Sequence, residues 1–274
     1  MPSEFWRIIS RLKNFRAKSL GHPVFSSLVF SALFLGFSLD AQIAKAGEAC
    51  DIYETRVLTT PAPPQWAPAY KNYEAMLTKF PEKADAILFG DSLAEGWPAD
   101  SFGSIFPGKT IGNLGVGGDM IQNSLWRLEQ MPVSRISPET IVVILGTNNL
   151  KARSKPCAIE AGLTRTVEKL HEIWPQAVVY MLTIPPRGNV FNDFEAERQE
   201  VNGFIEKMPS HNDYVRTVSG FDDVITCETR GTDQLQSWFP TYFPDECANY
   251  RGDHLHLTAA GYDVLASILK QGSN

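Results

Sequence analysis

Short apolar segments alternate with helical patterns along most of this chain, and this alternation restricts the fold more than any other feature. The candidate strands are residues 85–90, 109–114, 140–146, 177–184 and 213–218. Helical patterns cover residues 66–80, 119–131, 157–173 and 195–208, and a last helix is expected from Thr258, a good N-cap residue. Strands that are almost wholly apolar are buried on both faces. The sequence therefore predicts an α/β fold in which helix layers enclose a central parallel sheet.

Two segments depart from this alternation. Residues 47–65 contain three prolines and are expected to form an irregular lead, and residues 226–252 show no clear periodicity. We find no internal repeat and no linker long enough to separate two domains. One domain is therefore predicted for residues 47–274, with a long loop near its end, and long loops are often functional.

The first 46 residues are predicted to be a signal peptide. A basic stretch with five Lys or Arg residues precedes an apolar run from Val24 to Leu39, and the small-x-small triplet Ala44–Ala46 follows. The run has 16 residues, fewer than the roughly 20 that a spanning helix needs. An uncleaved membrane anchor is the alternative interpretation. Both predict an exported protein, in the periplasm or outside the cell.

The charge of the remaining chain limits its partners. Six of the 25 Lys and Arg residues and two of the 31 Asp and Glu residues lie in 1–46, so residues 47–274 carry a formal charge of −10. An acidic protein is not attracted to phosphate backbones or to anionic lipid. The sequence therefore argues against a nucleic-acid partner, and against a membrane partner unless the N-terminal segment is an uncleaved anchor.

Four cysteines follow the predicted cleavage site, and an even number in an exported protein suggests disulfides. Three pairings are possible. Cys227 with Cys247 is favoured because these residues flank one loop-like stretch, which leaves Cys50 with Cys157; buried free thiols are the alternative. No C-x-x-C motif is present, so neither a zinc site nor a redox dithiol is supported.

Polar and glycine-rich segments follow the predicted strands. Parallel strands end at one edge of a sheet, where open α/β folds bind their ligands. A further polar segment precedes the last helix and can reach that edge. These segments are Gly90-Asp91-Ser92-Leu93, Gly115-Val116-Gly117-Gly118-Asp119, Gly146-Thr147-Asn148-Asn149, Pro185-Pro186-Arg187-Gly188 and Asp253-His254-Leu255-His256.

The residue types in these segments suit acyl transfer. A serine becomes a nucleophile when a base takes its proton, and a histidine held by a carboxylate is the usual base. Ser92, His256 and Asp253 supply these groups, and the spacing of Asp253 and His256 places both in one tight loop. Donors for the developing oxyanion are available from the N–H groups of Ser92 and Gly115 and the side-chain amide of Asn148.

In order along the chain, these segments resemble the sequence blocks of the GDSL, or SGNH, hydrolases. Phe89–Leu93 resembles the first block, Asn113–Asp119 the second, Gly146–Asn149 the third and Asp253–Leu257 the last. The resemblance spans residues 85–270. It implies a flavodoxin-like three-layer α/β/α sandwich, with Ser92 as nucleophile, His256 as base and Asp253 as its partner. It also implies an oxyanion hole formed by Ser92, Gly115 and Asn148.

Within that family the chain is most similar to the platelet-activating-factor acetylhydrolase-like branch. Thr147-Asn148-Asn149, Pro186-Arg187-Gly188 and His256-Leu257-Thr258 carry this similarity. The stretch 226–250 is longer than that branch usually has. We expect it to form a rim over the site, with Trp238 and Tyr242 lining the substrate cleft. Arg187 is either a substrate contact or a surface charge.

The sequence thus predicts an exported serine esterase that hydrolyses short acyl esters, with O-acetyl groups on carbohydrate as the first substrate class. A lipid esterase or lysophospholipase of the same fold is the alternative, and a non-catalytic glycan-binding protein is a hypothesis from another class. A nucleotide- or flavin-binding domain would need a phosphate loop, which is absent. No metal is expected, because His254 and His256 lack a third ligand, and no cofactor is expected.

Overall fold

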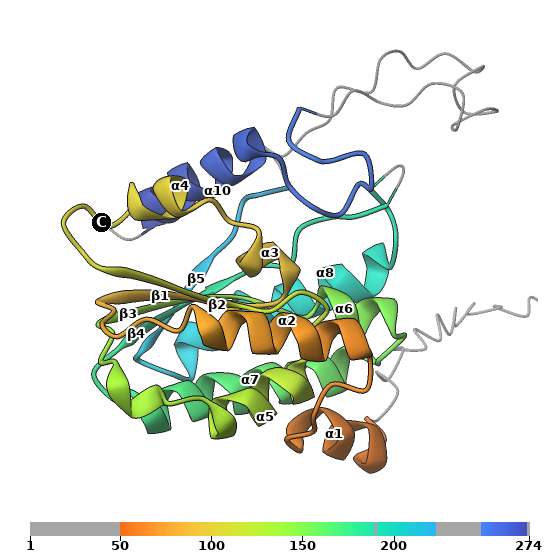
Figure 1. Cartoon of the computed structure of the whole chain (residues 1–274). Coiled ribbons are helices and arrows are strands. Elements are labelled where there is room, and N and C mark those ends of the chain that lie inside the picture. Colours follow the sequence, from red (N-terminus) through yellow and green to blue (C-terminus); the bar gives the residue numbers. More distant parts are fainter. Residues whose placement is uncertain (1–49, 189–190, 223–247, 273–274) are drawn as a thin grey trace, which may run out of the picture. The chain divides into compact units, whose positions relative to one another are not determined.

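The computed structural model describes residues 50–188, 191–222 and 248–272 (Figure 1). Its centre is a parallel sheet with the strand order β2-β1-β3-β4-β5. The strands are β1 (Ala86–Gly90), β2 (Ile111–Gly115), β3 (Thr140–Ile144), β4 (Val178–Leu182) and β5 (Val215–Val218). In register, Gly90 at the end of β1 faces Gly115 of β2 and Ile144 of β3. The five predicted strands are therefore confirmed, and three neighbouring strands end at the same level.

Helices cover both faces of the sheet and form two apolar cores. On one face lie α1 (Ile52–Thr59), α2 (Ala67–Thr78), α5 (Ile121–Gln130), α7 (Pro156–Ile173) and α8 (Glu195–Ile205); on the other lie α3 (Ser92–Glu95), α4 (Ala99–Gly103) and α10 (Ala259–Gly272). Alternate residues of β1 divide between the cores, with Ile87 and Phe89 in the first and Leu88 in the second. This is the predicted three-layer α/β/α sandwich.

Thr258 caps α10 as predicted, because its Oγ1 accepts the N–H of Gly261 at 3.2 Å. The short α6 (Thr147–Lys151), like α3 and α4, has too few residues to show a period and was not predicted. Two 3₁₀ turns, Val133–Arg135 and Met208–Ser210, complete the regular structure of the described part.

The predicted irregular lead at residues 47–65 is wrong, because α1 lies within it. Asp51 caps this helix by accepting the N–H of Tyr53 at 2.8 Å. Only Leu58 is fully buried, whereas Ile52, Tyr53 and Val57 are exposed, so the helix has no apolar stripe that a sequence pattern would reveal. A disulfide between Cys50 and Cys157 ties its start to α7, which confirms one predicted pairing.

Several predictions concern residues outside the described ranges. They are the signal peptide at 1–46, the Cys227–Cys247 pairing and the rim with Trp238 and Tyr242. Across the part of the chain that is described, no helix has the length and apolar character required to cross a bilayer.

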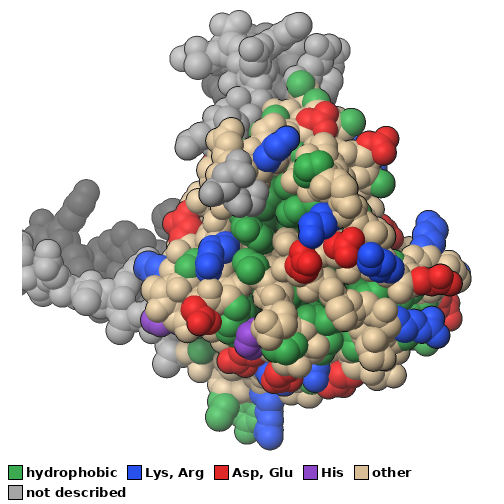
Figure 2. Space-filling model, turned by 90° about the vertical axis from the view of Figure 1, so that its left-hand side faces the viewer, with side chains coloured by type: hydrophobic (Ala, Val, Ile, Leu, Met, Phe, Trp, Pro, Cys, Tyr) green, Lys and Arg blue, Asp and Glu red, His purple; other side chains and the backbone are tan. Residues whose placement is uncertain are grey.

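The two ends of the sheet differ. The side from which the strands start is viewed in Figure 2, where acidic and basic side chains are interspersed and the hydrophobic ones are scattered between them. The segments that sequence analysis singled out emerge at the opposite side, which is the right-hand side of Figure 1. The candidate site is therefore expected at the carboxyl ends of the strands.

Candidate active site

Ser92 lies on a tight turn between β1 and α3. Gly90 enters the turn with φ +154°, and a Cβ there would collide with the carbonyl of Ile144 on the neighbouring strand. Asp91 then caps α3, since its Oδ1 accepts the N–H of Leu93 at 2.9 Å. Ser92 is the first residue of α3 and half-buried, so its hydroxyl is fixed in position but accessible.

The fold brings His256 to Ser92 across 164 residues of sequence. His256 Nε2 lies 2.9 Å from Ser92 Oγ, and His256 Nδ1 lies 2.6 Å from Asp253 Oδ2. Tyr262 of α10 donates its hydroxyl to the carbonyl of Leu93 at 3.0 Å, which fixes α10 against the serine turn. With the ring proton on Nδ1, where the carboxylate stabilises it, Nε2 is free to accept the serine proton.

Asp253 is held as an anion. Its Oδ1 accepts the N–H groups of Leu255 and His256 at 3.1 and 2.9 Å, in addition to the ring contact of Oδ2. Partial burial opposes ionisation, but the hydrogen bonds from the His256 ring and from the two N–H groups outweigh it and lower the pKa of Asp253 to about 2. The carboxylate therefore remains charged at neutral pH and can orient the imidazole.

Asn148 faces the same cleft as Ser92. It lies in α6, directly after the end of β3, and its Nδ2 donates to the carbonyl of Asp119 at 2.8 Å. An amide nitrogen carries two N–H groups, so one remains for a ligand. Its neighbour Asn149 points inward instead, where its Oδ1 accepts the N–H of Ile121 at 3.0 Å and supports the start of α5.

Gly115 does not supply the predicted oxyanion donor. Its N–H donates to Asn113 Oδ1 at 2.8 Å, and a Cβ at this position would collide with the backbone of Ala94 and Glu95. Position 115 thus has no room for a side chain, because α3 packs closely against β2 there. The glycines that line the cleft are Gly117 and Gly118. Among the described residues, no acceptor is found for the N–H of Gly118, which has φ +85°.

Arg187 is neither a substrate contact nor a surface charge. It is buried and does not line the cleft. Its guanidinium donates to the carbonyl and the hydroxyl of Thr147, at 3.1 and 2.9 Å. The prediction for Arg187 is therefore corrected, because the segment after β4 turns this side chain beneath α6 and away from the cleft.

A buried ion pair lies beneath the cleft. Arg127 Nε donates to Asp119 Oδ2 at 2.6 Å, its NH2 donates to the carbonyl of Gly90 at 3.0 Å, and its guanidinium lies 4.0 Å from the centroid of the Phe89 ring. Asp119 also accepts the hydroxyl of Ser124 at 2.8 Å. One guanidinium thus links the strand end before Ser92 to the residue whose carbonyl holds Asn148.

The cleft has a volume of about 590 Å³, within the usual range for small-molecule sites. Ser92, His256 and Asn148 open into it. The other lining residues are Trp66, Asn72, Glu95, Gly117, Gly118, Met120, Lys151, Ala152 and Leu255. Within the described ranges, no three His, Cys, Asp or Glu residues form a group that could hold a metal ion.

Comparison with known proteins places this geometry in a family. Residues 88–264 match the GDSL-like lipase/acylhydrolase family. The chain belongs to this family. Members of this family hydrolyse esters. The match confirms the resemblance that the four sequence blocks indicated.

Named relatives of this GDSL protein include mammalian acetylhydrolases. It is 27% identical over 197 residues to human platelet-activating factor acetylhydrolase IB subunit alpha2, covering 69% of this chain and 76% of the relative. It is 30% identical over 125 residues to the rat alpha1 subunit, and it spans only about half, 53%, of that relative.

Solved structures share the fold of this GDSL protein. A GDSL-like lipase from Bacteroides thetaiotaomicron has a TM-score of 0.53 at 18% identity, covering 74% of this chain and 95% of that one. A family 3 carbohydrate esterase from Clostridium thermocellum has a TM-score of 0.50 at 15% identity, covering 70% and 95%. At these identities the likeness concerns the fold alone.

Sequence reasoning missed three residues around the cleft. Gly118 stands beside Asp119 in the glycine-rich segment, so the sequence offered it as readily as Gly115. Arg127 follows Asp119 by eight residues on a helix that also carries Glu129, and a charged residue on such a helix is normally predicted to be solvated. Trp66 precedes α2, far from any motif, and no local signal connects it with Ser92.

Proposed function

We propose that this protein is an exported serine esterase that hydrolyses short acyl esters, O-acetyl esters above all, through Ser92, His256 and Asp253. The observation that carries the proposal is the unbroken chain of contacts from Asp253 through His256 to Ser92 at the edge of an open cleft. Family membership supports the reaction class. The Cys50–Cys157 disulfide supports export, since disulfides persist in oxidising compartments.

In the first step, His256 Nε2 takes the proton of Ser92 as Oγ bonds to the ester carbonyl carbon. The carbonyl oxygen becomes an oxyanion, for which the N–H groups of Ser92 and Gly118 and the free N–H of Asn148 are the donors we assign. When the tetrahedral intermediate collapses, the bond to the alcohol oxygen breaks and His256 returns its proton to that oxygen. Water then attacks the acyl-serine by the same route and releases the acid.

A fluorophosphonate probe tests the nucleophile. We expect the full-length protein to be labelled and a Ser92→Ala variant to remain unlabelled, because only a serine activated by its neighbours attacks the probe at an appreciable rate. p-Nitrophenyl esters from acetate to palmitate then rank acyl lengths, with acetate expected to be the best. A folded wild-type protein that is not labelled would favour the non-catalytic glycan-binding alternative.

A lipid ester or lysophospholipid is the second candidate substrate. It is favoured by the mammalian relatives, whose names specify a platelet-activating factor acetylhydrolase. Faster hydrolysis of a long-chain alkyl acetate than of ethyl acetate would support an acetyl ester of a lipid, and a preference for palmitate over acetate in the p-nitrophenyl series would support a long-chain acyl lipid.

A further inference from the structure

Beyond the acyl-transfer groups, the cleft has a wall that the reaction does not use. It consists of one aromatic ring, one amide and two charged groups: Trp66, Asn72, Glu95 and Lys151. Residues 66 and 72 precede the part of the chain that matches the GDSL family, which begins at residue 88. This wall is therefore built in part by a segment outside the family match.

Trp66 is fixed against the turn that carries Gly118. A Cβ on Gly118 would collide with ring carbons Cε3 and Cζ3 of Trp66, so the indole packs directly on this glycine. Trp66 nevertheless lines the cleft and is 59% exposed. One part of the ring is therefore supported by the protein, and the rest is a free apolar surface beside the oxyanion donors we assign.

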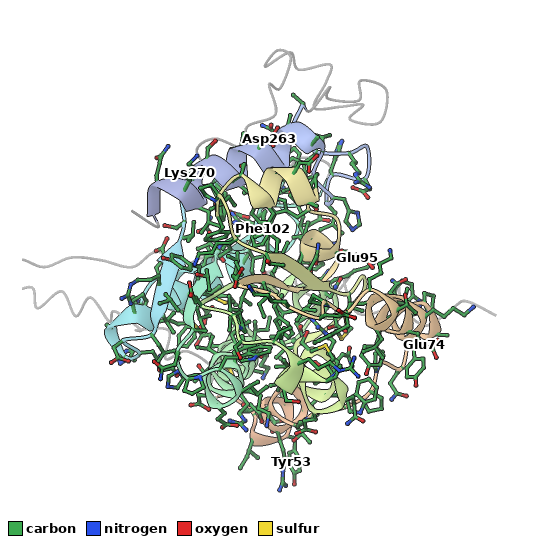
Figure 3. The ribbon with its side chains drawn as sticks, turned by 60° about the vertical axis from the view of Figure 1, so that its left-hand side comes forward. Tyr53, Glu74, Glu95, Phe102, Asp263 and Lys270 are labelled. Atoms are coloured by element: carbon green, nitrogen blue, oxygen red, sulfur yellow. A yellow bond between two sulfur atoms is a disulfide. The ribbon has the colours of Figure 1, made fainter. Side chains whose placement is uncertain are left out.

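Glu95 and Asn72 meet over Gly117. A Cβ on Gly117 would lie 2.5 Å from Glu95 Oε2 and 2.8 Å from Asn72 Nδ2. Asn72 Nδ2 donates to the carbonyl of Gly117 at 2.9 Å, which fixes the amide and leaves its oxygen as an acceptor. Figure 3 shows Glu95 on the side of the sheet edge where α2 lies. The carboxylate of Glu95 and the amide group of Asn72 thus lie together in one small region of the wall.

Lys151 adds a donor. It is the last residue of α6, three positions after Asn148, and it is exposed at the cleft. Among the described residues, neither Lys151 nor Glu95 forms an ion pair. Both charges are therefore available to a ligand, one as a donor and the other as an acceptor.

This combination suits a hydroxylated ring better than an alkyl chain. Each buried CH₂ gains about 0.8 kcal/mol only where apolar atoms surround it. The wall has no aliphatic side chain, and the aliphatic residues elsewhere in the described lining of the cleft are Met120, Ala152 and Leu255. A long chain on this wall would also remove Glu95 and Lys151 from water without replacing their hydrogen bonds. A sugar hydroxyl both donates and accepts, and the C–H face of the ring can lie on Trp66.

We propose that the alcohol half of the substrate is a sugar ring that packs on Trp66 and hydrogen-bonds to Glu95, Asn72 and Lys151. This rests on the proposed function, in which Ser92 attacks the ester. The scissile bond is then an O-acyl ester of a sugar hydroxyl. Ser92 Oγ takes the acyl group, and the sugar oxygen leaves with the proton that His256 returns.

Acetate esters of three kinds of alcohol test this. Methyl 6-O-acetyl hexosides of glucose, galactose and mannose carry the ring and its hydroxyls, cyclohexylmethyl acetate carries a ring of the same size without hydroxyls, and ethyl acetate carries neither. For the best hexoside we expect a kcat/KM at least 10-fold above that of cyclohexylmethyl acetate. We expect Trp66→Ala to lower kcat/KM for the hexosides about 10-fold more than kcat/KM for ethyl acetate, mainly through KM; one tenfold difference corresponds to about 1.4 kcal/mol. Any loss that the two kinds of ester share reports the contact of the indole with Gly118.

Matched variants separate the contributions of the wall. Trp66→Phe retains an aromatic face and should keep most of the kcat/KM for the hexosides. Glu95→Gln and Lys151→Met should lower kcat/KM for the hexosides and leave kcat/KM for cyclohexylmethyl acetate unchanged. Tyr53→Ala is the control, because Tyr53 is an aromatic residue of α1 that is 75% exposed and lies far from Glu95 in Figure 3. Tyr53→Ala should leave kcat/KM unchanged for all three kinds of ester.

The proposal is overturned if hexosides and cyclohexylmethyl acetate are hydrolysed equally well, or if Trp66→Ala affects ethyl acetate as strongly as the hexosides. In both cases Ser92 labelling and ester hydrolysis would still stand. If Ser92 is not labelled and no ester is cleaved, the proposed function fails. Calorimetric titration of Ser92→Ala with the hexosides then tests the wall alone: binding that Trp66→Ala abolishes supports it, and absence of binding overturns it.

Discussion

Two carboxylates near the cleft each contact a basic side chain at 2.6 Å, yet they differ in almost every other respect. The Asp253–His256 pair is accessible, with 50% and 32% of the side chains exposed, and lies in a loop three residues apart. The Asp119–Arg127 pair is sealed, with 0% and 1% of the side chains exposed, and joins the segment just before α5 to the second turn of that helix.

The difference follows from what each pair has to do. In the proposed mechanism His256 gains and loses a proton in each turnover, so its partner has to tolerate two charge states within reach of substrate and water. Arg127 keeps its charge. It contacts Gly90, the end of the strand that precedes Ser92, and Asp119, whose carbonyl accepts the side-chain amide of Asn148. We infer that the accessible pair performs the chemistry and the buried pair maintains the geometry. Variants that separate activity from stability test this division.

Asp253→Asn should have the largest effect, and only on activity. The amide favours the wrong imidazole tautomer, because its NH₂ group faces Nδ1 and requires an acceptor there. We expect kcat for p-nitrophenyl acetate to fall by about 10⁴, as for the equivalent change in a serine protease triad. The free energy of unfolding at pH 7 should change by less than about 1 kcal/mol, since the pair is largely solvated. Steady-state kinetics and urea unfolding check both. Retention of more than a tenth of the activity would contradict the assigned role.

Arg127→Met should have the second largest effect, and on stability first. Met occupies much of the apolar volume of the arginine, but Asp119 is left as a buried charge without its partner. Removing one member of such a pair costs about 3–5 kcal/mol. Urea unfolding at pH 7 measures this loss. A change below about 1 kcal/mol would show that the pair is not needed to hold the strand ends.

The double variant Asp119→Asn/Arg127→Met is the control for that loss. Asn is neutral, and it still offers an oxygen to Ser124 and a backbone carbonyl to Asn148. If the loss arises from the uncompensated charge, the double variant should regain more than half of the lost free energy of unfolding. Equal losses in the single and double variants would instead indicate that the contact of Arg127 with Gly90 matters most.

Local patterns in the sequence predicted the accessible pair but not the buried one. Asp253 and His256 are three residues apart beside a recognisable block, so spacing alone placed them together. The contact with Ser92 spans 164 residues, yet the rule that parallel strands end at one edge predicted it. The same rule predicted Asn148 at the cleft, because a strand end fixes position to within a residue or two.

Residues whose role depends on packing could not be predicted in this way. Gly115 and Gly118 stand in one short segment, and only the close approach of α3 to β2 shows that Gly115 serves packing. Arg187 follows a strand end as Asn148 does, but its long side chain turns inward to Thr147. α1 escaped prediction because its exposed apolar residues hide any helical stripe. Each case depends on tertiary neighbours that no local pattern encodes.

Asn148→Ala should have the third largest effect, a loss of kcat. It tests whether Asn148 is a donor to the oxyanion. Loss of one donor costs about 10²–10³ in kcat, or about 2.7–4 kcal/mol of transition-state stabilisation. KM for p-nitrophenyl acetate should change little, because the donor acts on charge that develops only in the transition state. Asn212→Ala is the control, since Asn212 makes its contact with the carbonyl of Met208, before β5. An equal loss of kcat in both variants would remove Asn148 from the proposed oxyanion hole.

The smallest effect concerns Asp91, a second buried carboxyl whose titration is opposite in sign to that of Asp253. Burial raises the pKa of Asp91 to about 7, and its Oδ2 has no hydrogen-bond partner in the described part. Between pH 4 and 7 the folded protein therefore holds a proton that the unfolded chain has lost, so stability falls as the pH rises, by at most about 1.4 kcal/mol per pH unit. Asp91→Asn should flatten the unfolding free energy in that window. Asp253 has its pKa lowered to about 2, so its contribution to stability is constant above pH 4 and is lost as the pH falls toward 2. Asp253→Asn should therefore flatten the profile below pH 4 and leave its slope above pH 4 unchanged, with only a small constant offset because the pair is largely solvated. Urea unfolding at half-unit intervals from pH 2 to 8 distinguishes the two variants, and identical profiles would refute the assigned difference between the buried and the accessible carboxyl.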